Sequence, residues 1–392
     1  MRATRRRFLS ALVAVAAATA LPLSTRATGT AVAAPLQPPT QKKTPAQRPV
    51  FQQQAGSDWV ELLGGVSVSR LFTPASGALL AFASGELLRS DDAGASWRAL
   101  TIPTRQVGAP IEVDPTNHDT LYVAANDGVQ RSNDAGATWT TIFPSEHPRE
   151  PVQLIAISPA DPRILFIAEY AYSTLYMHRS LDGGATWSTI EESQGSLCGM
   201  GIYIFKPHPA DPARVFKTAG CYAGRNLSDS LEESRDTGSS FTPVVSPREA
   251  FPSILVGGSG ADPLRYYLAA NKDHRSGGSL LQTSADDGAT WATLLDHSGG
   301  GTMQGEKDPS TTLTGLTYDS AAPQRVFLAQ QTRPAKSQGR NTYAVNGSGD
   351  GGATWNPLGS RPLAEIHELA LGIDGRYLFA ATGEGLLRIA VG

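Results

Sequence analysis

Charged side chains gather in long segments that separate the apolar runs of this sequence. Glu306 and Asp308 stand two residues apart in segment 297–312, and a carboxylate pair is what acid–base cleavage of a glycosidic bond requires. Segments 221–230 and 331–342 add arginines, and shorter segments add further charges. The residues that we predict for a binding surface are Arg149, Glu150, Arg225, His274, Arg275, Glu306, Asp308, Arg333 and Arg340. Each also fits a solvated charge on a loop, so the set assigns no catalytic residue.

Cofactor and metal motifs are missing from the sequence. It contains no His-Glu-x-x-His, no cysteine-rich metal spacing and no phosphate-binding loop, so we predict no metal and no cofactor. Eight of the 33 basic residues and none of the 36 acidic ones precede Asp58, which leaves a net charge of −11 from there onward. An acidic body disfavours nucleic acid and anionic membranes as partners.

A motif of the form Ser-x-Asp-x-Gly-x-Ser/Thr-Trp occurs six times, with Phe replacing Trp once. The copies span 90–97, 132–139, 180–187, 234–241, 284–291 and 348–355. They resemble the Asp box, or BNR repeat, of β-propellers, and six copies make the resemblance specific.

The residue types of the motif suit a turn between two strands. Asp and Ser side chains satisfy nearby backbone N–H groups, and Gly permits a positive φ where the chain reverses. The aromatic residue begins the next strand and brings a large apolar surface to the packing between repeats. We therefore predict a structural role for the aspartates of all six copies, Asp92, Asp134, Asp182, Asp236, Asp286 and Asp350.

Each motif stands in a frame of four short strands, which is the pattern of a propeller blade. The last repeat, from Ile366 to Ile389, has three strands and no motif, whereas Trp59 begins a lone strand at the other end. Together these fragments complete one more blade. The sequence therefore predicts an all-β fold, a seven-bladed β-propeller whose last blade is closed by the N-terminal strand.

Asp-box propellers include sialidases, xyloglucan-cleaving glycoside hydrolases, sortilin-type receptors and lumenal photosystem II assembly factors. The resemblance covers 59–392. This sequence lacks the Arg-Ile-Pro motif of sialidases. Xyloglucan-cleaving enzymes usually pair two propellers, whereas this sequence predicts one. The assembly factors usually carry an arginine-rich face, whereas the body of this chain is acidic. Fold does not fix function. We predict a monomeric, non-catalytic binding or scaffold propeller that recognises a protein or carbohydrate through its loop face, opposite the motif turns. The alternative is a glycoside hydrolase or lyase with its site at the channel mouth.

The first 34 residues are typical of an export signal. Arg5, Arg6 and Arg7 precede Phe8-Leu9, an alanine-rich apolar run and the small-residue pattern of residues 31–33. The segment resembles a twin-arginine signal, which predicts an extracytoplasmic protein without membrane insertion after cleavage. The alternative is an uncleaved anchor. Residues 35–57 read as a flexible linker, and 58–392 as the propeller.

Cys198 and Cys221 are the two cysteines of the chain. Cys198 precedes the first strand of the fourth blade and Cys221 follows the second strand. Adjacent antiparallel strands bring the start of one beside the end of the next, so we predict a disulfide. The alternative is two reduced, buried thiols.

Overall fold

The computed structural model describes residues 58–73, 78–104, 109–125, 127–145, 152–171, 174–194, 200–223, 226–227, 230–245, 252–257, 265–271, 279–286, 288–297, 310–334, 339–372 and 374–392. The chain divides into two compact units, Met1–Gln47 and Arg48–Gly392, and all these residues belong to the second. Their secondary structure is strand, turn and bend, without a helix that would be long and apolar enough to span a membrane. The predicted signal and the whole of the predicted linker lie outside the described residues.

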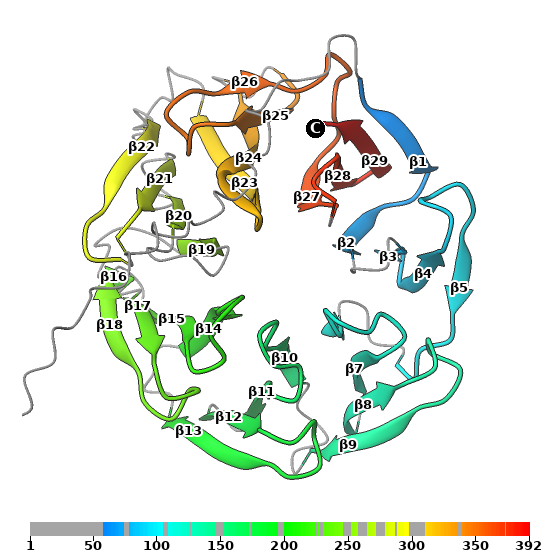
Figure 1. The fold of residues 1–392 in the computed structure, drawn as a ribbon, viewed down its shortest axis with the longest axis vertical. Coiled ribbons are helices and arrows are strands. Elements are labelled where there is room, and N and C mark those ends of the chain that lie inside the picture. The colour runs from blue at the N-terminus through cyan, green and yellow to red at the C-terminus, as the bar shows by residue number, and fades with distance from the viewer. Residues whose placement is uncertain are drawn as a thin grey trace, which may run out of the picture. The chain divides into compact units, whose positions relative to one another are not determined.

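Seven antiparallel sheets are arranged around a centre (Figure 1), and we number them as blades along the chain. Blades 1 to 3 are β2 (Val68–Phe72), β3 (Leu79–Ala83), β4 (Glu86–Ser90) and β5 (Arg98–Leu100); β6 (Ile111–Val113), β7 (Leu121–Ala125), β8 (Gly128–Ser132) and β9 (Thr140–Pro144); and β10 (Val152–Ile157), β11 (Leu165–Ala171), β12 (Thr174–Ser180) and β13 (Ser188–Gln194).

Blade 4 has one strand more than the predicted four, because β16 pairs with an extension of β15. Blades 4 to 6 are β14 (Met200–Pro207), β15 (Val215–Ala223), β16 (Asn226–Leu227), β17 (Ser230–Ser234) and β18 (Thr242–Val245); β19 (Pro252–Gly257), β20 (Arg265–Asn271), β21 (Ser279–Ser284) and β22 (Ala292–His297); and β23 (Ser310–Asp319), β24 (Ala322–Arg333), β25 (Thr342–Ser348) and β26 (Asn356–Pro357).

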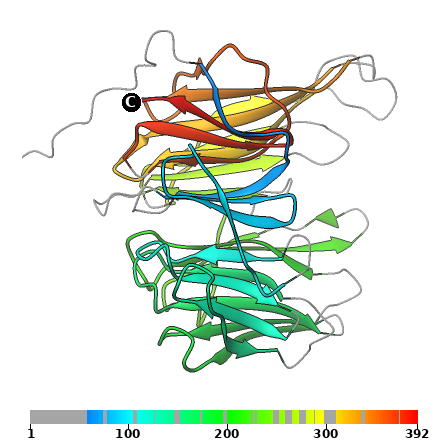
Figure 2. The same ribbon diagram turned by 90° about the vertical axis from the view of Figure 1, so that its right-hand side faces the viewer.

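The seventh blade combines both ends of the folded unit. β27 (Ile366–Leu371), β28 (Tyr377–Thr382) and β29 (Gly385–Ala390) are followed outward by β1 (Val60–Gly64), which pairs with β29 so that Val60 lies opposite Arg388. Seven blades closed by the N-terminal strand confirm the predicted fold. Viewed from the side, the strands run between the two faces of the ring (Figure 2).

The core lies between blades. In the described part of the chain, seven clusters of buried apolar side chains each draw on two neighbouring sheets, so every blade packs on both faces. Between blades 6 and 7, for example, Phe327 and Val345 meet Ile366 and Leu378. Apolar burial therefore holds the ring together contact by contact.

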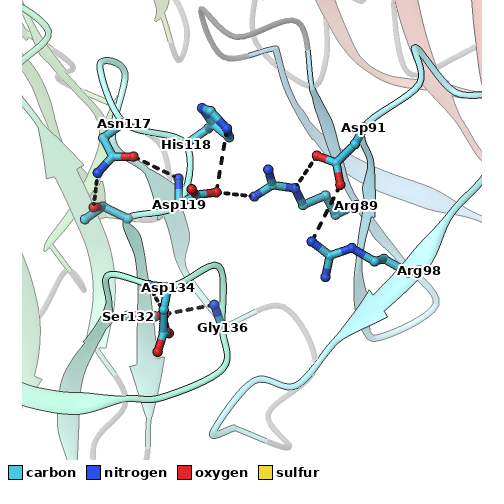
Figure 3. A network of polar contacts seen from close by, with 10 residues as sticks. Arg89, Asp91, Arg98, Asn117, His118, Asp119, Ser132, Asp134 and Gly136 are labelled. Carbon is cyan, nitrogen blue, oxygen red and sulfur yellow. Dashed lines mark hydrogen bonds and ion pairs between the residues drawn. The ribbon is translucent and has the colours of Figure 1, made fainter.

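The motif turns, as we call the six motif copies, share one hydrogen-bonding pattern. In blade 2, Ser132 Oγ donates to Asp134 Oδ1 at 2.8 Å and accepts the Gly136 N–H at 2.8 Å. Asp134 also accepts the Thr138 N–H at 2.8 Å and its hydroxyl at 2.6 Å. Gly136 has a φ of 87°, a conformation that glycine adopts without strain. Asp134 thus points into its own turn (Figure 3).

The N-terminal strand is fastened by a contact of the same kind between distant residues. Asp58 accepts the backbone N–H of Ser360 at 3.1 Å and its hydroxyl at 2.7 Å, although the residues are 302 positions apart. Trp59 donates its indole N–H to the Leu358 carbonyl at 3.1 Å. Trp97 makes the equivalent bond to the carbonyl of Leu62 in the preceding outer strand. The hydroxyl and backbone donors around Asp58 hold the pKa of its carboxyl well below the usual range.

Candidate functional site

Two of the residues predicted for the binding surface fall within the described ranges. Arg333 ends β24 and Arg340 precedes β25, and both side chains are exposed at the same end of blade 6. The other seven predicted residues lie outside the described residues: Arg149, Glu150, Arg225, His274, Arg275, Glu306 and Asp308. Their grouping into one surface therefore stays a prediction.

The predicted disulfide involves one residue outside the described ranges, Cys198. Cys221 lies within β15 and not after it as predicted, because the strand extends to Ala223, and the Cys221 backbone lies opposite Met200 of β14. The bond itself stays a prediction.

The motif-turn face of the ring is held by contacts between blades. The Arg89 guanidinium bonds to Asp91 of its own blade and to Asp119 of blade 2, both at 2.7 Å (Figure 3). At the equivalent position of blade 2, Arg131 donates to the Gly183 carbonyl of the blade 3 motif turn at 2.7 Å. These arginines fix neighbouring blades to one another, so they stabilise the ring.

Hydrogen bonds within the motif turns lower the pKa of all six motif aspartates. In the turns of blades 1 to 5, the Ser/Thr hydroxyl at the seventh motif position is the largest of the hydrogen-bond effects that lower the pKa of the aspartate to about 2. In blade 6 the Thr354 backbone N–H has the largest effect on Asp350, with the same result. Each carboxylate is therefore bound within its turn in the ionised state.

A cavity of about 680 Å³ occupies the central channel. The innermost strands of blades 1, 2, 3, 4 and 7 contribute to its wall. It extends along β10 from Gln153 to Ile157, and it reaches the motif-turn face at Pro115 and Pro159, just beyond the ends of β6 and β10. Most of the wall is aliphatic or proline, as is usual for a ligand pocket.

Four charged side chains from four blades line this cavity. They are Arg70 on β2, Glu112 on β6, Lys206 on β14 and Glu368 on β27. We call these four residues the channel cluster. Arg70 Nη2 donates to Glu112 Oε1 at 3.0 Å, and Glu368 Oε2 accepts the backbone N–H of Leu71 at 2.7 Å. Desolvation acts to lower the pKa of Arg70, but Glu112 and Glu368 together raise it.

Glu368 interacts electrostatically with the other three members of the channel cluster. Desolvation inside the channel raises the pKa of its carboxyl above the ordinary value of 4.5. Arg70, the Leu71 N–H and Lys206 oppose this shift, whereas the like charge of Glu112 adds to it. A carboxyl with a raised pKa and a second carboxylate in the same cavity are the residue types that acid–base chemistry uses.

None of the channel cluster was among the residues predicted for the site. The sequence carried one signal for it, a charged residue inside short apolar strands, as in Ile111-Glu112-Val113. The described residues contain no group of three or more His, Cys, Asp or Glu side chains placed to hold a metal ion.

Comparison with known proteins places the chain by fold. No protein-family model and no curated protein matches the sequence. Among solved structures, it resembles the GH74 xyloglucanase from Xanthomonas campestris, with a TM-score of 0.58 and 21% identity over 85% of this chain and 53% of that enzyme. It therefore spans about half the length of the xyloglucanase.

Two further structures match nearly along their whole length. YCF48 from Cyanidioschyzon merolae has a TM-score of 0.54 and 15% identity over 85% of this chain and 98% of that one. An oligogalacturonate lyase in complex with manganese has a TM-score of 0.61 and 12% identity, with coverages of 87% and 95%. At these identities the likeness is one of fold. The chain is a seven-bladed β-propeller, a fold that enzymes and other proteins share.

Proposed function

We propose that this chain is an exported, non-catalytic binding propeller whose ligand, a protein segment or a glycan, enters the central channel and contacts the loop face around one end of it. The observation that carries this proposal is the channel cavity. Its volume of about 680 Å³ lies in the range of roughly 300–1,000 Å³ typical of ligand sites. In such sites the aliphatic wall supplies affinity, and the few charged groups fix the orientation of the ligand.

Export rests on the sequence of residues 1–34, which resembles a twin-arginine signal. The predicted loop-face residues would add contacts at the rim. The structural neighbours, a xyloglucanase, a lyase and YCF48, share the fold of this chain, so the fold is compatible with binding and with catalysis.

The experiment is a glycan array and a peptide library screened with the purified protein, followed by a channel-filling variant. Gln153 is an exposed side chain of the cavity wall, so Gln153→Trp should fill part of the channel without burying a charge. Thr140→Trp adds the same group on the outer strand β9, where Thr140 is exposed. We expect Gln153→Trp to lose at least tenfold in affinity and Thr140→Trp to bind like the parent. Equal affinity of all three proteins would move the site away from the channel.

A second candidate function is a glycoside hydrolase or lyase, and the presence of Glu112 and Glu368 in the same cavity favours it. In such an enzyme the carboxyl with the raised pKa donates the proton and the ionised carboxylate acts as base or nucleophile. An activity screen on oligosaccharides distinguishes the two functions. Turnover that is abolished both by Glu112→Gln and by Glu368→Gln would show that the protein is an enzyme and overturn the binding proposal. A bound glycan that is recovered intact would support the binding proposal.

A further inference from the structure

The channel cluster contains one cation whose charge is not matched by a close partner. Glu112 is paired with Arg70 at 3.0 Å, and Glu368 is bonded to the Leu71 N–H. The Lys206 side chain is exposed to the cavity and forms no hydrogen bond or ion pair with another described residue; it acts on Glu368 only over a longer distance. An ammonium group that lines a cavity without a close counterion is available to an anionic partner.

Arg70 has unused donors for the same partner. A guanidinium carries five N–H groups, and among the described residues Arg70 uses Nη2 alone, toward Glu112. Its side chain is 43% exposed, and its guanidinium lies 5.2 Å from the centre of the Phe72 ring, which limits its freedom. A carboxylate that contacts Lys206 and Arg70 would form charge-assisted hydrogen bonds, the stronger class of such bonds in proteins.

The rest of the wall restricts the size and charge of the ligand. The cavity volume of about 680 Å³ suits a molecule of one or two sugar rings. Glu112 and Glu368 stand on the same wall, so a second or third negative charge would meet repulsion. These features select a monocarboxylate over a phosphate or a polyanion.

We propose that the channel cluster is a binding site for a small monocarboxylate such as a sugar acid, with Lys206 as the principal contact and Arg70 as the second. This inference rests on the proposed binding function and names the chemistry of its ligand.

Binding at this site is coupled to the protonation of Glu368. A bound anion occupies the two cations that stabilise the Glu368 carboxylate and repels it as well, so ligand and proton bind together. The other charged groups around Glu368 are Arg70 on β2, Glu112 on β6 and Lys206 on β14, with His367 adjacent on β27. Strands β10, β19 and β28 carry no Asp, Glu, Lys, Arg or His, and on β23 Asp319 is paired with Arg325. Affinity should therefore rise as the pH falls through the titration range of Glu368.

The test is calorimetric titration of the full protein with glucuronate, with glucose as the neutral counterpart and propionate as a simple acid. We expect glucuronate to bind, glucose not to bind, and affinity to be higher at pH 5 than at pH 8. Propionate that binds as tightly as glucuronate identifies the simple acid as the ligand class, and weaker binding identifies the sugar acid; both outcomes support a carboxylate site.

Variants separate the site from the fold. Lys206→Met should weaken glucuronate binding about tenfold or more, the loss of one charge-assisted hydrogen bond. Glu368→Gln should bind more tightly than the parent at pH 8 and lose the dependence on pH. Arg376→Met removes an exposed charge in the turn before β28, outside the cavity, and should bind like the parent.

Three results would overturn the inference: glucose that binds as well as glucuronate, unchanged affinity of a folded Lys206→Met, or no glucuronate binding at any pH. A neutral array ligand whose binding Gln153→Trp abolishes would then leave the proposed function intact. Glucuronate binding that Gln153→Trp does not affect would count against the channel as the site, and so against both.

Discussion

Removing the Trp59 side chain should weaken the contact between blades 6 and 7, where the N-terminal strand closes the ring; we call this contact the seam. Trp59 is 5% exposed and belongs to the apolar cluster between blades 6 and 7, beside Leu358 and Ile366. Replacing a buried Trp by Ala costs about 3–5 kcal/mol, the sum of lost burial and the cavity that remains. Trp59→Phe keeps most of the apolar surface and removes the 3.1 Å indole bond to the Leu358 carbonyl, which should cost about 1 kcal/mol.

The measurement is urea unfolding followed by far-UV circular dichroism, which does not depend on tryptophan fluorescence. Trp139→Ala is the matched control, because Trp139 has the equivalent place before the outer strand of blade 2. It is half-buried and lies away from the seam. Its loss should be smaller. A loss below about 1 kcal/mol for Trp59→Ala, or one no larger than that of Trp139→Ala, would refute the idea that this residue fastens the N-terminal strand.

The other predictions concern the motif turns, the cysteines and the leader. Asp134→Ala should lower the melting temperature, by less than Trp59→Ala, and leave channel affinity unchanged; lost binding in an equally stable protein would contradict a structural role. Because the six motif aspartates have a pKa of about 2 in the folded chain against an ordinary value of 3.8, the stability that they contribute is present above pH 4 and is lost as the pH falls toward 2. A melting temperature that stays constant between pH 4 and pH 2 would exclude this contribution. Thiol titration of the unreduced, denatured protein should find no free thiol, and two would mean that Cys198 and Cys221 are not bonded. N-terminal sequencing of the exported protein should place cleavage near Ala33 or Ala34, and an intact Met1 in that fraction would argue for a retained leader.

The sequence was sufficient to predict the blades because each blade is a local unit. Strand, motif turn and outer strand follow one another within about fifty residues, so one pattern recurs in register. The composite blade was predictable from its two incomplete fragments. The extra strand β16 was not, since two residues that pair with an extended β15 leave no periodic signal.

The fastening of Asp58 to Ser360 and the channel cluster share a reason for escaping prediction. Both depend on residues brought together by the closing of the ring, 302 positions apart in the first case and from four blades in the second. Hydrophobic patterns identify which segments become inner strands, but they do not say which two strands face each other across the channel. Long charged loops are conspicuous in a sequence, whereas a single Glu within a three-residue strand is not.

The carboxylates of this protein divide by environment. The motif aspartates are repeated and conspicuous, yet hydrogen bonds to their own turns lower the pKa of each to about 2, so none is available to give or take a proton near neutral pH. Glu368 belongs to no repeated motif, and desolvation raises its pKa inside a cavity that Lys206 and Arg70 also line. A carboxylate that accepts hydrogen bonds from its own turn stabilises that turn. Ionisation of a partly desolvated carboxyl costs free energy, so such a residue is kept in a protein when another gain offsets the cost. The proposed ligand would supply such a gain, because an anion bound beside Lys206 would favour the neutral form of Glu368.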